Sequence, residues 1–574
     1  MPGSGIIQLH TSLGENAKMA KARMCLILTL FLMFPVSLCR GKDYPYRWVY
    51  VSRSLRRDSD VADIKGIVKT ASEHGLNGMV LSAGLDRLDR QPRDYFEKLE
   101  QIKQTCNQYN IEIIPIIFSV GYGGSILACD RNLAAGIPVK DALFVVKDER
   151  ASHVAEPDVK IVNAGFEEYD GDRLTGYGFH DKPGEVSFVD KSIFKSGKAS
   201  LRFENFGKYE HGHARVMQEL KVRPHRCYKL SCWVKTEQLE PKGSFRITIL
   251  SPDGRNLAPM DPAVPSTTNW KQVVMGFNSL GCDTARVYIG VWGGKSGRFW
   301  IDDIQIEEVG LLNILRRPGT PVTVRSEKTG TIYAEGKDFA EITDPRLNFR
   351  FDHDPPVIKI LPAGRIKKGE RLRVSYYHGI AINRGQVSAC MSEPKVYEIW
   401  KKQAGLIHEH LAPEKYLLSM DEIRAGGACM ACKERNITMA QILGDCITKQ
   451  VKIIREVNQD SEVLTWSDML DPNHNAHDNY YLVEGDFTNS WKYVPKDLII
   501  LCWYYNKRNE SLKFFSSLGF RTLAGAYYDG DTLENPTGWL RVIERTPRAC
   551  GIMYTTWQNK YELLASFGDI VMGR

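Results

Sequence analysis

The sequence predicts an α/β protein: a (β/α)8 TIM barrel interrupted after its third strand by an all-β jelly-roll sandwich and a second small β module. Three observations predict this fold. Apolar strands alternate with amphipathic helices over residues 47–120 and again over 393–557. Between these segments, short strands of alternating polarity are separated by Gly, Pro, Asn and Asp turns. Three strands before the insertion and five after it complete the eight that a parallel barrel needs.

The first part of the barrel follows the order strand, helix, strand, helix, strand. Its elements are expected at residues 47–52, 58–75, 78–84, from Pro92 onward, and at 111–120. The last of these is a continuous apolar run, typical of a strand buried on both faces. The βα rhythm then ends, and residues 121–146 are predicted to be a loop.

The second part begins with an amphipathic helix and continues in the same βα rhythm. Helices are predicted at 393–412, 438–457, 510–518 and 537–545. Strands are predicted at the apolar run 416–418 and at 462–468, 497–504, 521–528 and 550–557. A long loop is predicted at 470–496.

At 574 residues the chain is too long for one ordinary core, so several domains are expected. The predicted boundaries are 1–41 for a signal peptide, 42–150 and 386–574 for the two parts of the barrel, 158–310 for the jelly roll and 311–385 for the small β module.

The N-terminus resembles an export signal. Lys18, Lys21 and Arg23 precede an unbroken apolar stretch over residues 25–38, with small residues near 37–41. The stretch is shorter than the roughly 20 apolar residues of a spanning helix. We therefore expect export to the periplasm or beyond, cleavage near residues 39–41, and no membrane attachment afterwards.

Charge argues against a nucleic-acid partner. The net charge of +7 comes from 76 basic and 69 acidic residues, with no basic block or acidic run. A solvated surface of mixed charge is expected instead.

The stretch YLLSMDEIRAGG, residues 416–427, sets an acidic pair at the end of a buried strand. Asp421 and Glu422 follow the apolar run 416–418 after Ser419 and Met420. Carboxylates at the carboxyl ends of barrel strands are a common site of catalysis. Acidic residues after strands also cap helices in any α/β protein, and that alternative stays open.

The all-β region resembles jelly-roll carbohydrate-binding modules. The resemblance is carried by NAGFE (163–167), SGKASLRF (196–203), YKLSCWVKT (228–236) and GRFWIDDIQIEE (297–308). It implies a glycan-binding surface and a structural calcium near Glu167 and Asp303. The alternative is a sandwich that only braces the barrel. In either case the insertion is predicted to stand outside the chemistry.

The barrel resembles the family-20 glycoside hydrolases, the β-N-acetylhexosaminidases. That family carries Asp-Glu after strand four, Trp after strands five and six, Tyr-x-Asp after strand seven and Trp-x-Glu after strand eight. The matching residues here are Asp421-Glu422, Trp466 in TWSD, Trp503 in CWYY, Tyr527-Tyr528-Asp529 in AYYDGD, and Trp557-Gln558-Asn559.

The resemblance implies substrate-assisted catalysis, in which the substrate's own 2-acetamido oxygen attacks the anomeric carbon. Asp421 would hold the acetamido N–H and stabilise the oxazolinium, Tyr527 would bind the acetamido oxygen, and Glu422 would protonate the leaving group. The three tryptophans and Asp529 are predicted to contact the sugar. No cofactor is required, and the expected partner is an oligo- or polysaccharide.

For the residues that would bind sugar hydroxyls, the sequence both matches the family and departs from it. Arg53 matches the family's hydroxyl-binding arginine, with Arg56 and Arg57 as alternatives. Asn559 stands where the family has a glutamate that grips the distal hydroxyls. The residues before Asp421 read LLSM, where the family has His-x-Gly-Gly.

Two other functions remain open. One is a retaining or inverting glycosidase acting on a non-acetamido sugar, with Asp468 or Asp529 paired with Glu422. The other is a catalytically inactive carbohydrate-binding protein.

Cysteine usage adds one local prediction. Eleven of the 13 cysteines lie beyond residue 39, mostly in apolar contexts. Cys429 and Cys432 form a CxxC motif, for which a disulfide or free thiols are expected ahead of zinc, because no second CxxC or His pair lies nearby.

Overall fold

The computed structural model describes residues 44–574, apart from residues 259 and 261. Within that part of the chain, eight parallel strands close into a barrel. They are β1 (Tyr46–Ser52), β2 (Gly78–Ser82), β3 (Glu112–Ile117), β21 (Lys415–Leu418), β23 (Glu462–Trp466), β25 (Ile499–Cys502), β26 (Arg521–Tyr527) and β27 (Ala549–Thr555). The predicted combination of a barrel with separate all-β parts is confirmed. The predicted signal segment, residues 1–41, lies outside the described residues.

The barrel interior is filled by large apolar side chains that alternate with outward-facing ones. Inward-facing residues from successive strands form one buried cluster: Trp48, Tyr50, Val80, Ile114, Leu417, Leu464, Trp466, Ile499, Leu501, Leu523, Cys550 and Met553. A second, larger cluster fills the space between strands and helices. Two buried faces explain why these strands appear in the sequence as continuous apolar runs.

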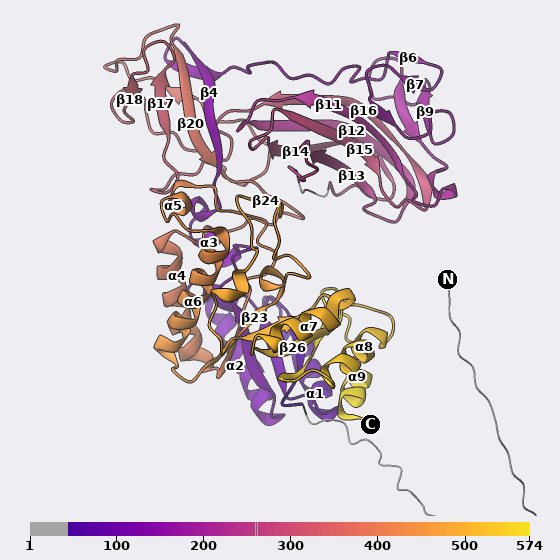
Figure 1. The fold of residues 1–574 in the computed structure, drawn as a ribbon, viewed down its shortest axis with the longest axis vertical. Coiled ribbons are helices and arrows are strands. Elements are labelled where there is room, and N and C mark those ends of the chain that lie inside the picture. Colours follow the sequence, from indigo (N-terminus) through magenta and orange to yellow (C-terminus); the bar gives the residue numbers. More distant parts are fainter. Residues whose placement is uncertain (1–43, 259, 261) are drawn as a thin grey trace, which may run out of the picture. The chain divides into compact units, whose positions relative to one another are not determined.

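Helices surround the outside of the barrel (Figure 1). They are α1 (Asp58–Glu73), α2 (Arg93–Gln108), α4 (Pro394–Leu411), α6 (Met439–Val457), α7 (Arg508–Ser517), α8 (Glu534–Ile543) and α9 (Leu564–Met572). The sequence also sets their ends. Before α6, the Thr438 hydroxyl accepts from the Gln441 amide at 3.2 Å, and the Gln441 side chain accepts from the Thr438 amide at 2.9 Å. This capping box satisfies two backbone donors that the helix leaves unpaired.

The jelly roll consists of two antiparallel sheets over one apolar core. One sheet has the order β14 (Thr268–Asn278), β12 (Cys227–Glu240), β16 (Ser296–Glu308), β10 (Ser200–Phe203) and β9 (Ser187–Asp190). The other has the order β13 (Phe245–Leu250), β15 (Thr284–Val291), β11 (Ala214–Lys221) and β8 (Phe179–His180).

A six-stranded sheet forms the second β part, and it corrects the predicted loop at 121–146. Its order is β18 (Ile332–Tyr333), β17 (Thr323–Ser326), β20 (Arg371–His378), β4 (Ile137–Lys147), β5 (Arg150–His153) and β19 (Ile358–Lys359). β4 pairs antiparallel with β20, so residues just after the third barrel strand belong to this sheet. The same region also contains the short helix α3 (Gly124–Cys129). The prediction failed because the partner strand lies far away in sequence.

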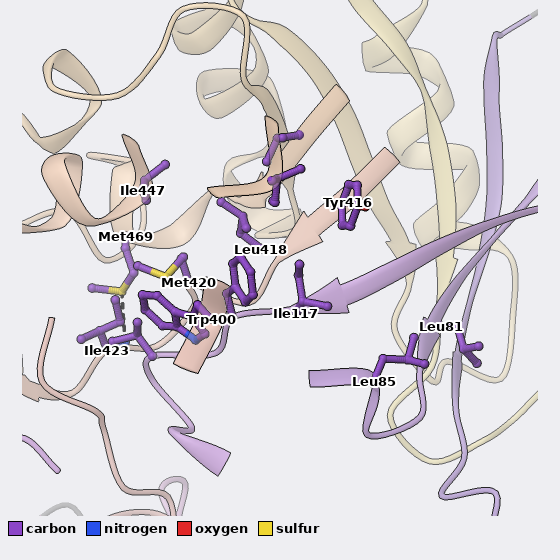
Figure 2. Packing of buried hydrophobic residues seen from close by; sticks show 14 of the residues in the cluster. Leu81, Leu85, Ile117, Trp400, Tyr416, Leu418, Met420, Ile423, Ile447 and Met469 are labelled. Atoms are coloured by element: carbon purple, nitrogen blue, oxygen red, sulfur yellow. Dashed lines mark hydrogen bonds between the residues drawn. The ribbon is translucent and has the colours of Figure 1, made fainter. Parts of the chain in front are cut away.

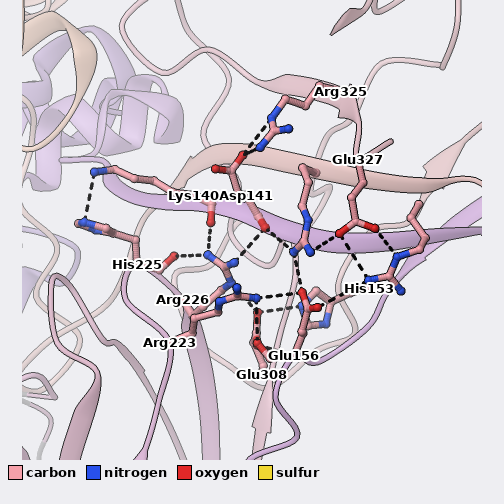
Figure 3. A network of polar contacts seen from close by, with 12 residues as sticks. Lys140, Asp141, His153, Glu156, Arg223, His225, Arg226, Glu308, Arg325 and Glu327 are labelled. Atoms are coloured by element: carbon pink, nitrogen blue, oxygen red, sulfur yellow. Dashed lines mark hydrogen bonds and ion pairs between the residues drawn. The ribbon is translucent and has the colours of Figure 1, made fainter. Parts of the chain in front are cut away.

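Ion pairs connect this sheet with the jelly roll (Figure 3). Glu308 of β16 pairs with Arg226 at 3.0 Å and with His153 of β5 at 3.1 Å. Glu156 pairs with Arg223 at 2.9 Å and with Arg373 of β20 at 2.6 Å.

Across residues 44–574, excluding 259 and 261, there is no helix with the length and apolar character to span a membrane.

Candidate active site

The acidic pair lies where β21 ends, between anchored apolar side chains. The hydrogen bonds between β21 and β3 continue one residue beyond the end of β21, because the Ser419 amide donates to the Ile117 carbonyl at 2.8 Å. Figure 2 shows Leu418, Met420 and Ile423 packed among other buried apolar side chains, and all three are at most 1% exposed. Asp421 and Glu422 are therefore held on a backbone that is fixed on both sides.

A close backbone approach also fixes this segment. A Cβ added at Gly121, after β3, would lie 2.0 Å from the Asp421 carbonyl oxygen. The Gln386 side chain donates to the carbonyls of both Gly121, at 2.9 Å, and Glu422, at 2.7 Å. Only glycine permits this approach, because any side chain would collide with the backbone that carries the acids.

Both carboxylate oxygens of Glu422 have partners. The Tyr122 hydroxyl donates to Oε2 at 2.5 Å, and the Arg424 guanidinium lies 2.7 Å from Oε1. Glu422 adopts a left-handed backbone with φ of 50°, which is uncommon for a residue other than glycine. This turn places Asp421 and Glu422 at one end of the strand, despite the alternation that would separate them.

A third carboxylate, that of Asp468, is hydrogen-bonded to the backbone of the pair. It follows β23, is fully buried, and accepts from the Glu422 amide at 2.9 Å, from Asn475 at 2.9 Å and from the Trp503 indole at 3.4 Å. Burial, and then the charge of Asp468, raise the pKa of Asp421 into the neutral range. Burial raises the pKa of Asp468 as well. Carboxyl groups that titrate near neutrality are typical of acid–base sites.

Aromatic residues follow several of the other barrel strands, near the end of the barrel that carries the acidic pair. Trp557 is 46% exposed, and its ring centroid lies 5.1 Å from that of Tyr50 and 6.0 Å from that of the buried Trp466. Trp503 stacks on Tyr528 with centroids 6.0 Å apart and ring planes 6° apart. Exposed aromatic faces of this kind pack well against the apolar faces of sugar rings.

The structure assigns different places to the two neighbouring tyrosines. Tyr527, the predicted acetamido-binding residue, is 2% exposed, and its ring stacks on Tyr554 at 4.1 Å in the core between barrel and helices. Tyr528 is 41% exposed, and its pKa is raised to about 12 by burial and then by the charge of Glu422. Residues 527–529 all have positive φ, from 60° to 79°, so the alternation of a regular strand does not continue through them.

Asp529 holds the last loop of the barrel. Its carboxylate accepts from the Thr556 hydroxyl, from the Trp557 amide at 2.9 Å and from the Gln558 amide at 3.2 Å. These bonds orient Trp557, so Asp529 supports the predicted sugar-binding tryptophan through the backbone.

Arg53 and Asn559 lie together in the structure. The Arg53 guanidinium donates to the Asn559 side-chain oxygen and to the Ser52 carbonyl, and it lies 3.5 Å from Asp63. The first and last strands of the barrel are adjacent, which brings these two distant positions side by side.

Sequence reasoning missed four residues of the site: Tyr50, Tyr122, Arg424 and His474. The ring centroids of His474 and Trp503 lie 4.4 Å apart. Burial lowers the pKa of His474 to about 4. Two of them could have been found from their positions in the sequence. Tyr122 follows the third strand, and Arg424 lies two residues after the acidic pair.

The predicted calcium ligands of the jelly roll face one loop. Glu167 accepts from the amides of Lys198 at 2.7 Å and Ala199 at 3.2 Å, and Asp303 accepts from the Ser196 hydroxyl at 2.7 Å. Their role in binding calcium stays a prediction.

A surface cavity of about 1280 Å³ lies between α7 and α8. Its lining includes Arg508, Lys513 and Arg541, and Asp421, Glu422 and Asp468 are not among its lining residues. This cavity is therefore separate from the acidic residues of the candidate active site.

Comparisons with known proteins give only distant matches. No protein-family model and no curated protein matches the chain. Among solved structures, a chitobiase of Flavobacterium johnsoniae is 8% identical with a TM-score of 0.36, covering 92% of this chain and 48% of its own. A rhamnosidase of Novosphingobium sp. PP1Y is 10% identical with a TM-score of 0.33, covering 89% and 55%. The chain thus spans about half the length of each enzyme.

The carbohydrate-binding module TmCBM61, solved with β-1,4-galactotriose, is 18% identical with a TM-score of 0.21 and covers 26% of this chain and 98% of its own. These similarities are too distant to assign an activity.

Proposed function

We propose that this protein is a glycoside hydrolase that cleaves β-linked N-acetylhexosaminides by substrate-assisted retaining catalysis. The observation that carries the proposal is the placement of Asp421 and Glu422 side by side at one strand end, within the aromatic surroundings described above. Carboxyl groups in such a setting can protonate a leaving oxygen and stabilise a developing cation.

The two acids take different roles in this proposal. Glu422, beside the exposed Tyr122, donates a proton to the leaving oxygen. Asp421 accepts the acetamido N–H and, when ionised, stabilises the oxazolinium that forms as the acetamido oxygen attacks the anomeric carbon. Tyr528, rather than the buried Tyr527, is the tyrosine assigned to the acetamido oxygen. Water then opens the oxazolinium and restores the acetamido group.

The surroundings of the other carboxylates favour this scheme over a two-carboxylate mechanism. A retaining pair stands about 5 Å apart on opposite sides of the scissile bond. Asp529 is occupied by the backbone of residues 557–558, and Asp468 is fully buried with three donors. Both therefore suit supporting roles better than direct attack.

Export and glycan binding by the jelly roll complete the proposal. The apolar N-terminal stretch supports export. The motifs shared with carbohydrate-binding modules support a surface that retains the enzyme on a polymer.

Aryl glycosides with and without a 2-acetamido group test the reaction. We expect turnover only when the group is present, because it supplies the nucleophile. Equal rates on plain glucosides or galactosides would reject the mechanism. Binding of N-acetylhexosamine oligosaccharides without turnover of any substrate would favour the inactive carbohydrate-binding protein.

A further inference from the structure

Three cysteine sulfurs converge outside the site described above. Cys429 and Cys432 belong to the segment that follows the acidic pair, and Cys390 comes from the stretch before α4. Their sulfurs lie 3.5 Å (Cys390 to Cys429), 3.8 Å (Cys390 to Cys432) and 3.6 Å (Cys429 to Cys432) apart. All three residues are at most 4% exposed. Among the residues that the structure describes, this is the one cluster of His, Cys, Asp or Glu side chains close enough to share a metal ion.

The separations match those of metal-bound thiolates. Zinc binds thiolate sulfur at about 2.3 Å in a tetrahedron, which places neighbouring sulfurs roughly 3.8 Å apart. A disulfide requires about 2.05 Å and joins only two sulfurs. Here all three pairs have nearly the same separation, so the sulfurs point to one centre.

The surroundings suit a soft cation bound by thiolates. The Arg317 guanidinium lies 3.8 Å from the Cys429 sulfur and 3.2 Å from Glu393, and both side chains are at most 7% exposed. A small enclosed cavity lies beside the sulfurs, and Met391 and Met439 also line it. The guanidinium lies between the Cys429 sulfur and the Glu393 carboxylate, so it places a positive charge next to both. Thiolate and thioether sulfur select thiophilic ions over Mg²⁺ or Ca²⁺.

We propose that Cys390, Cys429 and Cys432 bind one Zn²⁺ ion as three thiolate ligands. Each thiol gives up its proton to solvent as its bond to the metal forms. The ion would tie the segment after Glu422 to the stretch where the chain returns to the barrel. Cysteine 390 was not linked to the CxxC motif in the sequence, because 38 residues separate it from Cys429. The inference does not depend on the reaction that the barrel catalyses.

Metal analysis of the full chain tests the site. We expect one Zn²⁺ per chain after purification without chelator, and an intense sulfur-to-metal absorption when Co²⁺ replaces it. Serine substitution of Cys390, Cys429 or Cys432 should weaken Zn²⁺ binding by more than the 10–100-fold typical of changes outside the ligand shell. Cys106→Ser is the matched control, since Cys106 is a buried free thiol on α2, and it should bind Zn²⁺ as wild type does.

If the cysteine variants fail to fold, measurements on the wild-type protein still test the zinc site. A chelator should lower the Tm of the wild-type protein and abolish the Co²⁺ absorption. The proposal would be overturned if the purified chain held no metal and Cys429 were linked to Cys432 by a disulfide. Mass spectrometry would detect that disulfide as a loss of two hydrogen atoms. Occupancy by copper(I) alone would overturn the assignment to zinc.

Discussion

At the scale of single residues, the proposed proton donor is the most direct target. Glu422→Gln should reduce turnover of substrates with poor leaving groups by roughly 10²–10⁴-fold, the usual contribution of general acid catalysis. Aryl substrates whose leaving groups need little protonation should be largely spared. Steady-state kinetics on both classes measure the difference, and Glu434→Gln, an exposed acid on the same segment, serves as control. Wild-type rates on oligosaccharides would exclude Glu422 as the acid.

The pH dependence separates the roles of Asp421 and Glu422. Because the pKa of Asp421 is raised into the neutral range, its ionised fraction falls as the pH drops below neutral. If ionised Asp421 stabilises the oxazolinium, kcat/KM should fall with decreasing pH in that range. Asp421→Asn should lose activity on good and poor leaving groups alike, and its residual rate should lack this acidic limb. A rate that instead falls as the pH rises through neutrality would make Asp421 the proton donor.

Asn559 tests how the terminal sugar is recognised. A carboxylate there would accept charge-assisted hydrogen bonds from sugar hydroxyls, worth about 1.5–3 kcal/mol. Asn559→Glu should therefore raise kcat/KM on simple terminal N-acetylhexosaminides, unless pairing with the adjacent Arg53 consumes the new charge. Asn559→Gln is the neutral control. Comparing plain with 6-sulfated substrates shows whether the position faces that hydroxyl, since an unchanged ratio means that it does not touch the sugar.

The sequence allowed the position of the acidic pair at a strand end to be predicted, because an apolar strand precedes it. It did not show which of the two neighbouring tyrosines, Tyr527 or Tyr528, is exposed. Strand alternation assigns a face to each residue only while φ stays negative, and residues 527–529 all depart from that condition. Asp468 comes after another strand, so its hydrogen bond with the Glu422 amide forms only when the barrel closes. The same holds for Tyr50, whose pKa the charge of Asp421 helps to raise.

At the scale of elements, the loop after β3 supports the acids through a contact that only glycine allows. Gly121→Ala would place a methyl group 2.0 Å from the Asp421 carbonyl, so the acidic segment must move. We expect activity to fall by at least tenfold together with a lower Tm. Gly124→Ala is the matched control, because its added methyl would meet nothing within 4 Å. Equal activity of the two variants would show that the position of the acidic segment tolerates this displacement.

Elements were predictable where the apolar pattern alone determined them. The barrel strands were found because both of their faces are buried. β4 was missed although its sequence IPVKDALFVVK contains two apolar stretches, because its partner β20 comes more than 200 residues later. A strand whose pairing is so distant in sequence cannot be distinguished from a loop by local pattern.

At the scale of the whole molecule, the jelly roll contacts the loop that supports the site. Arg255 donates to the carbonyls of Tyr481 and Val483. The Tyr481 ring lies 5.1 Å from the Arg424 guanidinium, which pairs with Glu422. We expect Arg255→Ala to lower kcat/KM several-fold on small substrates, because the loop loses two charge-assisted bonds. Arg246→Ala, an exposed arginine of the same module, should not. Wild-type kinetics for both variants would support the prediction that the insertion stands outside the chemistry.

The strand order of the barrel also governs how this chain can fold during synthesis. β3 pairs with β21, whose Leu417 lies opposite Ile116 although roughly 300 residues separate them. The first three strands therefore leave the ribosome with an unpaired edge that stays open until the insertion has been translated. Because the jelly roll has its own apolar core, it can become compact during that interval. Barrel closure then becomes the late step, and an open apolar edge is prone to aggregate until it occurs.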